Sequence, residues 1–300
     1  MRTFRSAEVV PTFGYARPTN LADAIDILDD QGERAHPLAG GTDLAVALRH
    51  GATRPGLVVD LKGVAELAPA IEQKAGAFVI NANTPMIDVE RDETVKRRIP
   101  GLVESAEVVG SVQIRNRATL AGNLCNASPA ADTPPMLMAL GASVVVMGRG
   151  GERRMATDEF LTGYRETALG RGEIVLAIEI PEHGPRTGTA FMKLGVRRAM
   201  EVSIVCVGAR LELADDDTIA GAGIGLGSVA PTTIRPSSSE VLLLGRRATS
   251  DLFAEAGVRA LEACDPIDDL RASAEYRWAM VPVMVERALQ LALERAGEPK

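Results

Sequence analysis

The chain has 300 residues, of which 46% are hydrophobic and 24% charged, and its formal net charge at pH 7 is −7. This composition is typical of a folded globular protein with one large or two medium domains. The negative charge argues against nucleic-acid binding, which needs a basic face. No apolar run reaches the length of a membrane span, and the first residues show no signal-peptide core. We therefore expect a cytoplasmic protein with no nucleic-acid partner and no membrane span.

The cysteines and histidines indicate no metal centre. Cys125, Cys206 and Cys264 lie far apart, and an iron–sulfur cluster normally needs four cysteine ligands. Structural disulfides are not expected in a reducing cytoplasm. We interpret Cys125 as a small packing residue rather than a redox thiol, because no partner cysteine or basic neighbour is evident. No His/Glu motif or serine elbow is present, so we predict no metal site and no catalytic acid–base residue.

The first part of the chain predicts helices and strands in alternation. Asn20 precedes an amphipathic helix that begins at Leu21 and stops near Gly32. A Thr84 cap before a helix beginning at Pro85 is expected further on, and Pro100-Gly101 is read as an interruption. The other elements predicted up to residue 180 are strands at 34–38, 57–61, 77–83, 142–147 and 174–180, helices at 44–49, 102–109 and 134–140, and a hairpin return at 153–155.

Beyond a linker at 182–187 the pattern changes. Strands are predicted at 189–196, 202–213 and 218–226, followed by helices at 237–244, 250–263 and 276–296. We interpret the three aspartates 215–217 as a solvated hairpin turn rather than a metal site, because three adjacent carboxylates cannot all point at one ion. Consecutive antiparallel strands followed by helices indicate a separate α+β domain.

A long stretch at 115–132 reads R-N-R-A-T-L-A-G-N-L-C-N-A-S-P-A-A-D. It has no hydrophobic period and is rich in turn residues, so we predict a long loop of the kind that is often functional. Its small side chains would let backbone N–H groups approach a ligand, and consecutive N–H groups at glycine turns form anion sites. Asp132 precedes Thr133-Pro134-Pro135 and is a candidate helix N-cap.

An upstream loop, L-A-G-G-T-D at 38–43, has similar chemistry. Apolar residues, a glycine pair and then a helix start form an arrangement that can cradle phosphate. An ordinary glycine turn before a helix is the alternative interpretation of this loop on its own.

Taken together, A-G-G-T-D-L and I-R-N-R-A-T-L-A-G-N-L-C-N-A-S-P-A-A-D resemble the FAD-binding subunit of the molybdenum hydroxylases. That family includes carbon monoxide dehydrogenase flavoproteins and the flavin domain of xanthine dehydrogenase. The resemblance continues more loosely to Tyr276-Arg277. It implies an α+β fold with a two-subdomain FAD-binding domain of the PCMH or vanillyl-alcohol-oxidase type at 1–184 (subdomains about 1–62 and 63–184). A carbon monoxide dehydrogenase flavoprotein-like domain, an antiparallel sheet plus helices, would follow at 185–300.

The resemblance also implies a set of cofactor-binding residues, with the FAD pyrophosphate between the two loops. These are Ala39, Gly40, Gly41, Thr42, Asp43, Thr119, Ala121, Gly122, Asn123, Asp132, Val175 and Lys193.

Several of these assignments have alternatives. Asp132 would accept from a ribose or adenine-side hydroxyl, or cap a helix. Lys193 would reach the flavin, or be a solvent-facing strand lysine. Val175 would pack near the adenine, and Val202 or Ile204 would cover the isoalloxazine, with core packing as the alternative for all three.

Other positions concern phosphate and departures from the family pattern. Arg115 and Arg117 could neutralise phosphate. We prefer the interpretation that they form surface ion pairs, which contribute little to stability. Ala121 stands where many relatives carry glycine. Its methyl group would narrow the approach to the phosphate, and because alanine is small we expect only a slight shift. Thr42-Asp43 replaces the His-Ser or Gln-Ser pairs common in the carbon monoxide dehydrogenase branch, so that substrate is not assigned.

By resemblance, the chain is an oxidoreductase flavoprotein that passes electrons through FAD to an external acceptor. A large molybdenum-cofactor subunit and a small subunit with two [2Fe-2S] clusters would be its partners in a heterohexamer. FAD would do the chemistry, and the protein would supply binding and electrostatics. The alternatives are a self-sufficient flavin oxidase or reductase of the same fold superfamily, and a scaffold subunit that has lost flavin.

Overall fold

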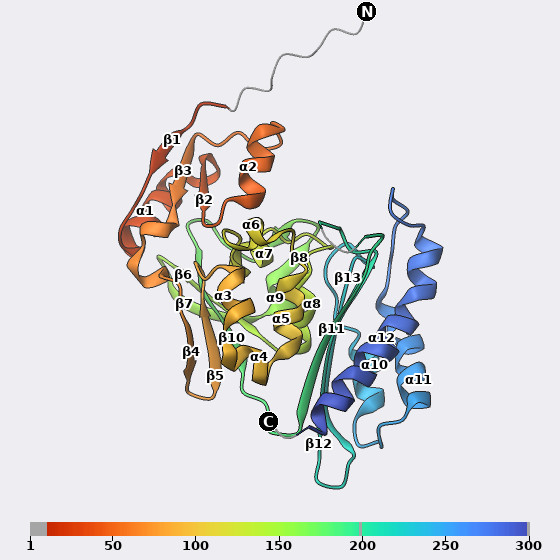
Figure 1. The fold of residues 1–300 in the computed structure, drawn as a ribbon. Coiled ribbons are helices and arrows are strands. Elements are labelled where there is room, and N and C mark those ends of the chain that lie inside the picture. Colours follow the sequence, from red (N-terminus) through yellow and green to blue (C-terminus); the bar gives the residue numbers. More distant parts are fainter. Residues whose placement is uncertain (1–10, 198–199, 299–300) are drawn as a thin grey trace, which may run out of the picture.

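A computed structural model describes residues 11–197 and 200–298. The chain begins with a small parallel sheet, in which β3 (Leu57–Asp60) lies between β1 (Gly14–Ala16) and β2 (Ala35–Leu38). Helices α1 (Leu21–Gln31) and α2 (Thr42–Arg49) follow β1 and β2. The predicted start of α1 is confirmed, because the Asn20 side chain accepts a hydrogen bond from the Asp23 N–H. This unit lies above the rest of the molecule in Figure 1.

A five-stranded antiparallel sheet forms the second layer, in the order β4-β5-β10-β6-β7. Its central strand β10 is largely buried, while the edge strand β7 is mostly exposed. The predicted hairpin return is therefore confirmed, as an edge strand paired with β6. The strands of this sheet are β4 (Ile71–Lys74), β5 (Ala77–Asn81), β6 (Ser143–Gly148), β7 (Gly151–Ala156) and β10 (Ile174–Pro181).

Short helices occupy the segment between β5 and β6. Pro100 begins a helix rather than interrupting one, because proline suits the first helical turn. Thr84 caps no helix, since its Oγ1 bonds both backbone groups of Ala70 instead. The helices of this segment are α3 (Met86–Arg91), α4 (Glu93–Arg98), α5 (Pro100–Glu107), α6 (Val112–Arg115), α7 (Leu120–Cys125) and α8 (Thr133–Ala139).

The stretch at 115–132 is not one long loop, which corrects the prediction. Helix α7 lies within it, capped by Thr119, whose Oγ1 accepts from the Gly122 N–H at 2.9 Å. A six-residue helix is too short to show a helical hydrophobic period, so the pattern gave no signal for it.

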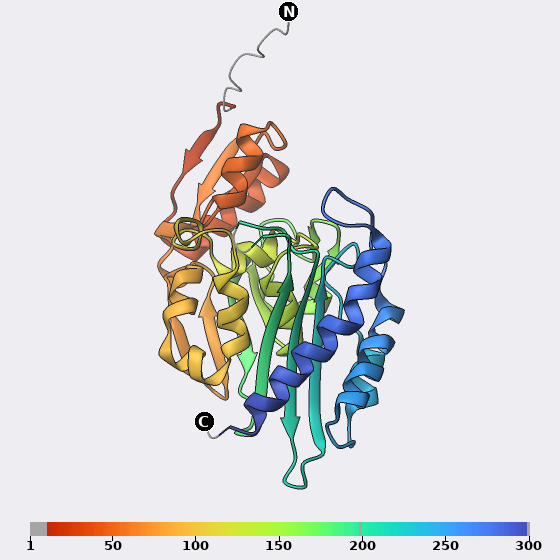
Figure 2. The ribbon, with the colours of Figure 1, turned by 45° about the vertical axis from the view of Figure 1, so that its right-hand side comes forward.

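The C-terminal part is an antiparallel sheet with helices, as predicted. Its strands run in the order β11-β12-β13, and α12 crosses the sheet diagonally (Figure 2). Asp216 and Asp217 lie in the turn before β13. Among the described residues, no three or more histidine, cysteine, aspartate or glutamate side chains are grouped so that they could hold a metal ion. The remaining elements are α9 (Thr157–Phe160), β8 (Leu161–Gly163), β9 (Glu166–Thr167), β11 (Thr187–Leu194), β12 (Val205–Leu213), β13 (Ile219–Gly227), α10 (Ser237–Leu243), α11 (Ser250–Ala260) and α12 (Ala274–Ala296).

Helix α8 packs directly on the C-terminal sheet. A β-carbon on Gly223 or Gly225 would lie 2.0 Å from the carbonyl oxygen of Ala139 or Pro135, so only glycine permits this approach. The core forms two clusters of buried side chains, and Phe191 from β11 and Cys206 from β12 belong to the first cluster. The two regions are therefore tightly joined, and the boundary at 184/185 stays a prediction. Of the residues described, none belongs to a helix long and apolar enough to cross a bilayer.

Candidate cofactor-binding site

The two loops singled out in the sequence lie against each other. A β-carbon on Gly40 would lie 2.1 Å from the Arg117 carbonyl oxygen and 2.9 Å from the Ala118 Cα, so residue 40 must be glycine for this contact to form. Gly41 has φ +76° and precedes α2, whose first turn has no side-chain cap. Together the pair provides a permissive backbone followed by a helix N-terminus, which favours an anion.

Next to these loops is a cavity of about 250 Å³. It brings together three of the predicted residues, Asp43, Asn123 and Asp132, which come from α2, α7 and the start of α8. The residues that line it are Asp43, Gly110, Asn123, Asn126, Ser128, Ala130, Ala131, Asp132, Met200, Glu201 and Val202.

Hydrogen bonds link α2 to Asn126, which lines the cavity, and through Asn126 to Arg165. Asp43 Oδ1 accepts a hydrogen bond from Asn126 Nδ2 at 3.2 Å, and Asn126 Oδ1 accepts one from Arg165 Nη1 at 3.0 Å. Burial raises the pKa of Asp43, and the positive charge of Arg165 opposes this rise. The first unit and the central stretch are therefore linked by side chains as well as by the Gly40 contact.

Lys193 and Asp132 form a buried ion pair beside the cavity. Lys193 Nζ lies 2.8 Å from Asp132 Oδ2 and donates to the Glu201 carbonyl at 2.8 Å, while Asp132 Oδ1 accepts from Ser203 Oγ at 2.6 Å. The Lys193 side chain is 11% exposed, so the solvent-facing interpretation is wrong. The capping role of Asp132 is wrong too, because its side chain makes no cap hydrogen bond. Burial raises the pKa of Asp132, and Lys193 and Ser203 oppose this rise.

Two of the N–H groups predicted to bind phosphate in the second loop, those of Gly122 and Asn123, are engaged at the start of α7. The Gly122 N–H donates to Thr119 Oγ1, and the Asn123 N–H donates to the Thr119 carbonyl. Asn123 Oδ1 accepts from Thr133 Oγ1 at 2.7 Å. Ala121 is buried in the core, which explains how a methyl group is accommodated at this position.

Of the residues predicted to contact the adenine or the isoalloxazine, Val175 and Ile204 lie apart from the cavity and Val202 lines it. Val175 on β10 is buried opposite Val146 of β6, and Ile204 is buried in the C-terminal core. Val202 is 38% exposed and lines the cavity. Arg115 forms no surface pair, because it is buried and its Nε lies 2.7 Å from Glu90 Oε2.

Sequence reasoning missed several residues around the cavity. Asn126 and Ser128 stand inside the stretch already singled out, and their small polar side chains were a usable signal. Arg165, Met200 and Glu201 gave no signal, because tertiary packing alone brings their segments to the cavity.

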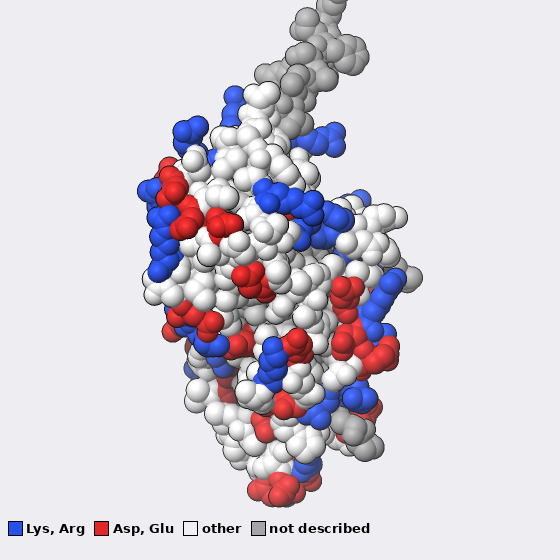
Figure 3. Space-filling model, turned by 90° about the vertical axis from the view of Figure 1, so that its left-hand side faces the viewer, with Lys and Arg blue, Asp and Glu red and all other residues white. Residues whose placement is uncertain are grey.

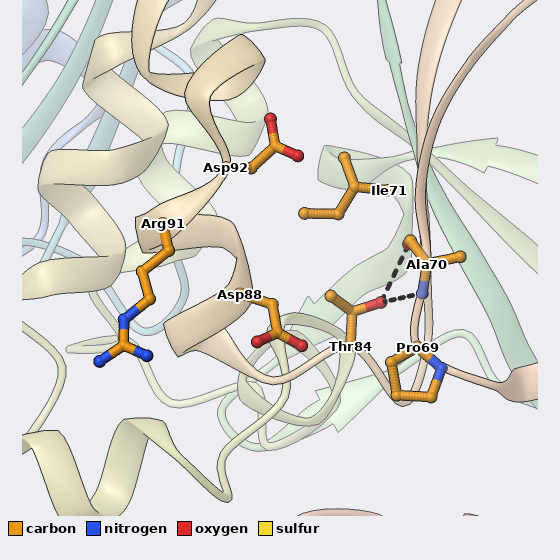
Figure 4. Close-up of a pocket in the computed structure, with 7 residues that line it drawn as sticks. All are labelled: Pro69, Ala70, Ile71, Thr84, Asp88, Arg91 and Asp92. Atoms are coloured by element: carbon orange, nitrogen blue, oxygen red, sulfur yellow. Dashed lines mark hydrogen bonds between the residues drawn. The ribbon is translucent and has the colours of Figure 1, made fainter.

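A second cavity of about 330 Å³ lies elsewhere, between the start of β4 and helix α3 (Figure 4). Asp88, Arg91 and Asp92 lie on one side of it and Ala70 and Ile71 on the other. None of the predicted cofactor-binding residues lines it.

Comparison with known proteins identifies the class. Residues 11–183 match the family described as the FAD binding domain in molybdopterin dehydrogenase, and residues 190–292 match the carbon monoxide dehydrogenase flavoprotein C-terminal domain. The chain is thus an FAD-binding flavoprotein. It belongs to the family of FAD-binding subunits of the molybdopterin dehydrogenases, and it is a flavoprotein subunit of an oxidoreductase.

Individual relatives agree with this assignment over nearly the whole chain. The carbon monoxide dehydrogenase medium chain of Hydrogenophaga pseudoflava is 31% identical over 96% of this chain and 100% of its own. The caffeine dehydrogenase subunit beta of Pseudomonas sp. (strain CBB1) is 33% identical over 94% of this chain and 95% of its own. Among solved structures, carbon monoxide dehydrogenase from Hydrogenophaga pseudoflava superposes with a TM-score of 0.92 at 31% identity, covering 96% of this chain and 99% of that one.

The residues present fit FAD. The pyrophosphate of FAD is an anion, and the Gly40-Gly41 backbone leads into a helix N-terminus without a side-chain cap. The adjoining cavity is smaller than pockets that enclose a drug-sized ligand, so it would take part of the cofactor only. No lysine cluster is needed, because neutral backbone donors can hold phosphate.

Proposed function

We propose that this chain is the electron-transfer subunit of a multisubunit molybdenum hydroxylase. When bound, FAD supplies the redox chemistry between iron–sulfur clusters on a small partner subunit and an external acceptor. The contact between Gly40 and the Arg117 carbonyl is the observation that carries this proposal, because it joins the two loops that would hold the FAD pyrophosphate.

In this proposal the chain's own residues bind and orient the cofactor. The backbone N–H groups of the segment from Ala39 to Asp43 would hold the pyrophosphate from one side, and Thr119, Ala121, Gly122 and Asn123 would face it from the other. Asp132 and Lys193 would line the route toward the flavin and ribose. Because several N–H groups of α7 are engaged internally, the Gly40-Gly41 loop would supply most of the phosphate contacts. Val175 would act near the adenine only through the packing of β10.

The partner assignment is supported by the relatives, which are named as a medium chain and as a subunit beta. A large molybdenum-cofactor subunit and a small iron–sulfur subunit would complete a cytoplasmic heterohexamer. The substrate would bind on the large subunit.

The test is anaerobic electron delivery to the purified flavoprotein. The small iron–sulfur subunit, reduced beforehand and freed of reductant, should bleach the flavin absorbance of this chain near 450 nm, whereas the oxidised small subunit should not. If the isolated chain instead turned over an organic substrate completely without partners, it would be a self-sufficient oxidase and the proposal would be wrong.

A further inference from the structure

Helix α1 has an acidic C-terminal half. Asp26, Asp29 and Asp30 lie in its last two turns, and the last turn contains no basic residue. Negative charge at this end opposes the helix macrodipole, whose C-terminus is itself negative. The sequence of α1 therefore leaves an electrostatic cost that the helix does not offset by itself.

Two arginines from loops of the second sheet supply the missing positive charge. Arg149, in the turn between β6 and β7, places its Nε 2.8 Å from Asp26 Oδ1 and its Nη2 2.7 Å from Asp30 Oδ1, and its Nη1 bonds Asp29. Arg171 donates from Nε to the Asp29 carbonyl at 2.6 Å and from Nη2 to the Asp30 carbonyl at 3.4 Å. One arginine thus pairs with the carboxylates and the other caps the helix end.

The backbone is shaped for this contact. Gly172 has φ +74°, and a β-carbon there would lie 2.6 Å from Asp29 Cβ, so the loop before β10 lies directly against the helix end. Gly32, which ends α1, has φ +55°, and a β-carbon there would lie 3.2 Å from Arg171 Cζ. Figure 3 shows the side of the molecule on which α1 and β7 lie, where acidic groups stand next to basic ones.

We propose that Arg149 and Arg171 form an electrostatic latch that holds the first unit, residues 14–60, in position on the second sheet. Helix α1 packs on β2 and β3, and β2 leads directly into the Gly40 loop. The latch therefore sets how closely Gly40 approaches the Arg117 carbonyl, on the opposite side of the same unit. Both arginines are positioning residues for the cofactor site, and this part of the proposal rests on the proposed function.

The latch is stabilised by several contacts that the two arginines make with the same helix end. A single exposed ion pair contributes little to stability. Here one guanidinium joins three carboxylates and a second one engages the carbonyls of the same turn, so the helix is held at several points. The apolar face of α1 packs in the shared core, and the latch would fix the polar edge of that interface.

The experiment compares the full-length chain with Arg149→Gln, Arg171→Gln and the double variant. Arg154→Gln is the matched control, because Arg154 of β7 is an exposed arginine too but pairs with Glu152 and Glu179 of its own sheet. Without FAD, the double variant should show about fivefold faster hydrogen exchange in the peptide 35–45. Its dissociation constant for FAD should rise about fivefold. Exchange and FAD affinity equal to those of the control would overturn the proposal.

Ionic strength gives a test that needs no variant. Raising NaCl from 50 to 500 mM screens exposed charges, so exchange at 35–45 in the FAD-free wild type should accelerate toward the rate of the double variant, which should change little. An unchanged wild-type rate would overturn the latch even if the double variant failed to fold. A chain that takes up no FAD would overturn the proposed function, whereas the exchange experiments would still decide the latch.

Discussion

The carbonyl oxygen of Arg117 lies 2.1 Å from the position that a β-carbon on Gly40 would occupy. This contact, like the hydrogen bond between Asn126 and Asp43, joins the small parallel unit to the central stretch. It brings the end of β2 to the segment between α6 and α7. Any side chain at position 40 must push the two loops apart, because the group that it meets is backbone.

Replacing Gly40 tests this contact. We expect Gly40→Ala to lower the free energy of unfolding by about 1–3 kcal/mol through overpacking and to weaken FAD binding at least about tenfold. The measurements are denaturant unfolding and FAD titration. Gly150→Ala is the control, because a β-carbon there meets nothing within 4 Å. FAD affinity equal to that of the control would show that the contact does not shape the site.

The Lys193–Asp132 pair predicts a pH-dependent stability. In Lys193→Met the carboxylate remains buried without its cation, which should cost about 3–5 kcal/mol at neutral pH. The folded-state pKa of Asp132 is raised by burial, so its contribution to stability falls as pH rises from about 3.9 through that raised value. Loss of Lys193 raises the pKa of Asp132 further, because the charge of Lys193 opposes the rise. The stability difference between Lys193→Met and the wild type should therefore shrink toward pH 4, where Asp132 becomes protonated.

Urea unfolding between pH 4 and pH 8 measures this effect. The double variant Lys193→Met/Asp132→Asn is the control and should recover much of the lost stability at neutral pH, since it carries no unpaired charge. A defect in Lys193→Met that is constant across this pH range would contradict the buried-pair interpretation.

Asp43 predicts a pH dependence of FAD binding. Its pKa is raised by burial, and it stands at the helix start where the FAD pyrophosphate would lie. Protonated Asp43 tolerates the anion and ionised Asp43 repels it, so FAD affinity should fall as pH rises through the Asp43 pKa. Titrations from pH 4 upward to pH 8 should show this decline in the wild type, and it should be reduced in Asp43→Asn. Parallel profiles for the two proteins would rule out Asp43 as the group responsible.

The three thiols should be unreactive in the folded chain. Burial raises the pKa of Cys125, Cys206 and Cys264 to about 12, which leaves almost no thiolate at neutral pH. A disulfide reagent added at pH 8 should label all three in denaturant but label the native protein at least about a hundredfold more slowly. Rapid labelling of native Cys125 would mean that it is a reactive thiol and not the packing residue that the sequence predicts.

Much of the fold could be predicted from sequence because long helices and strands have recognisable caps and hydrophobic patterns. The caps and apolar spacing of α1, and the β-branched runs of β6 and β10, gave the correct elements. Helix α7 was missed because six residues of mixed character show no period. The edge strand β4 was missed because three of its four residues are exposed.

The candidate site was predictable only in part. Gly40 and Gly41 could be recognised because glycine is required where residue 40 meets the Arg117 backbone and where residue 41 takes a positive φ. Lys193 and Asp132 were both named, but their pairing was not foreseen, because it depends on β11 packing beside the start of α8. Arg165 reaches Asn126 through a short hairpin whose strands hold only two or three residues, and so short a segment carries no sequence signal.

The measurement that tests the central claim most directly is identification of the bound cofactor. The purified full-length chain should show flavin absorption bands, and acid should release FAD, without covalent linkage, at about one per chain. A well-folded chain that is colourless and takes up no added FAD, even with its partner subunits present, would contradict the account. In that case the Gly40-Gly41 and 119–123 segments would be structural turns only.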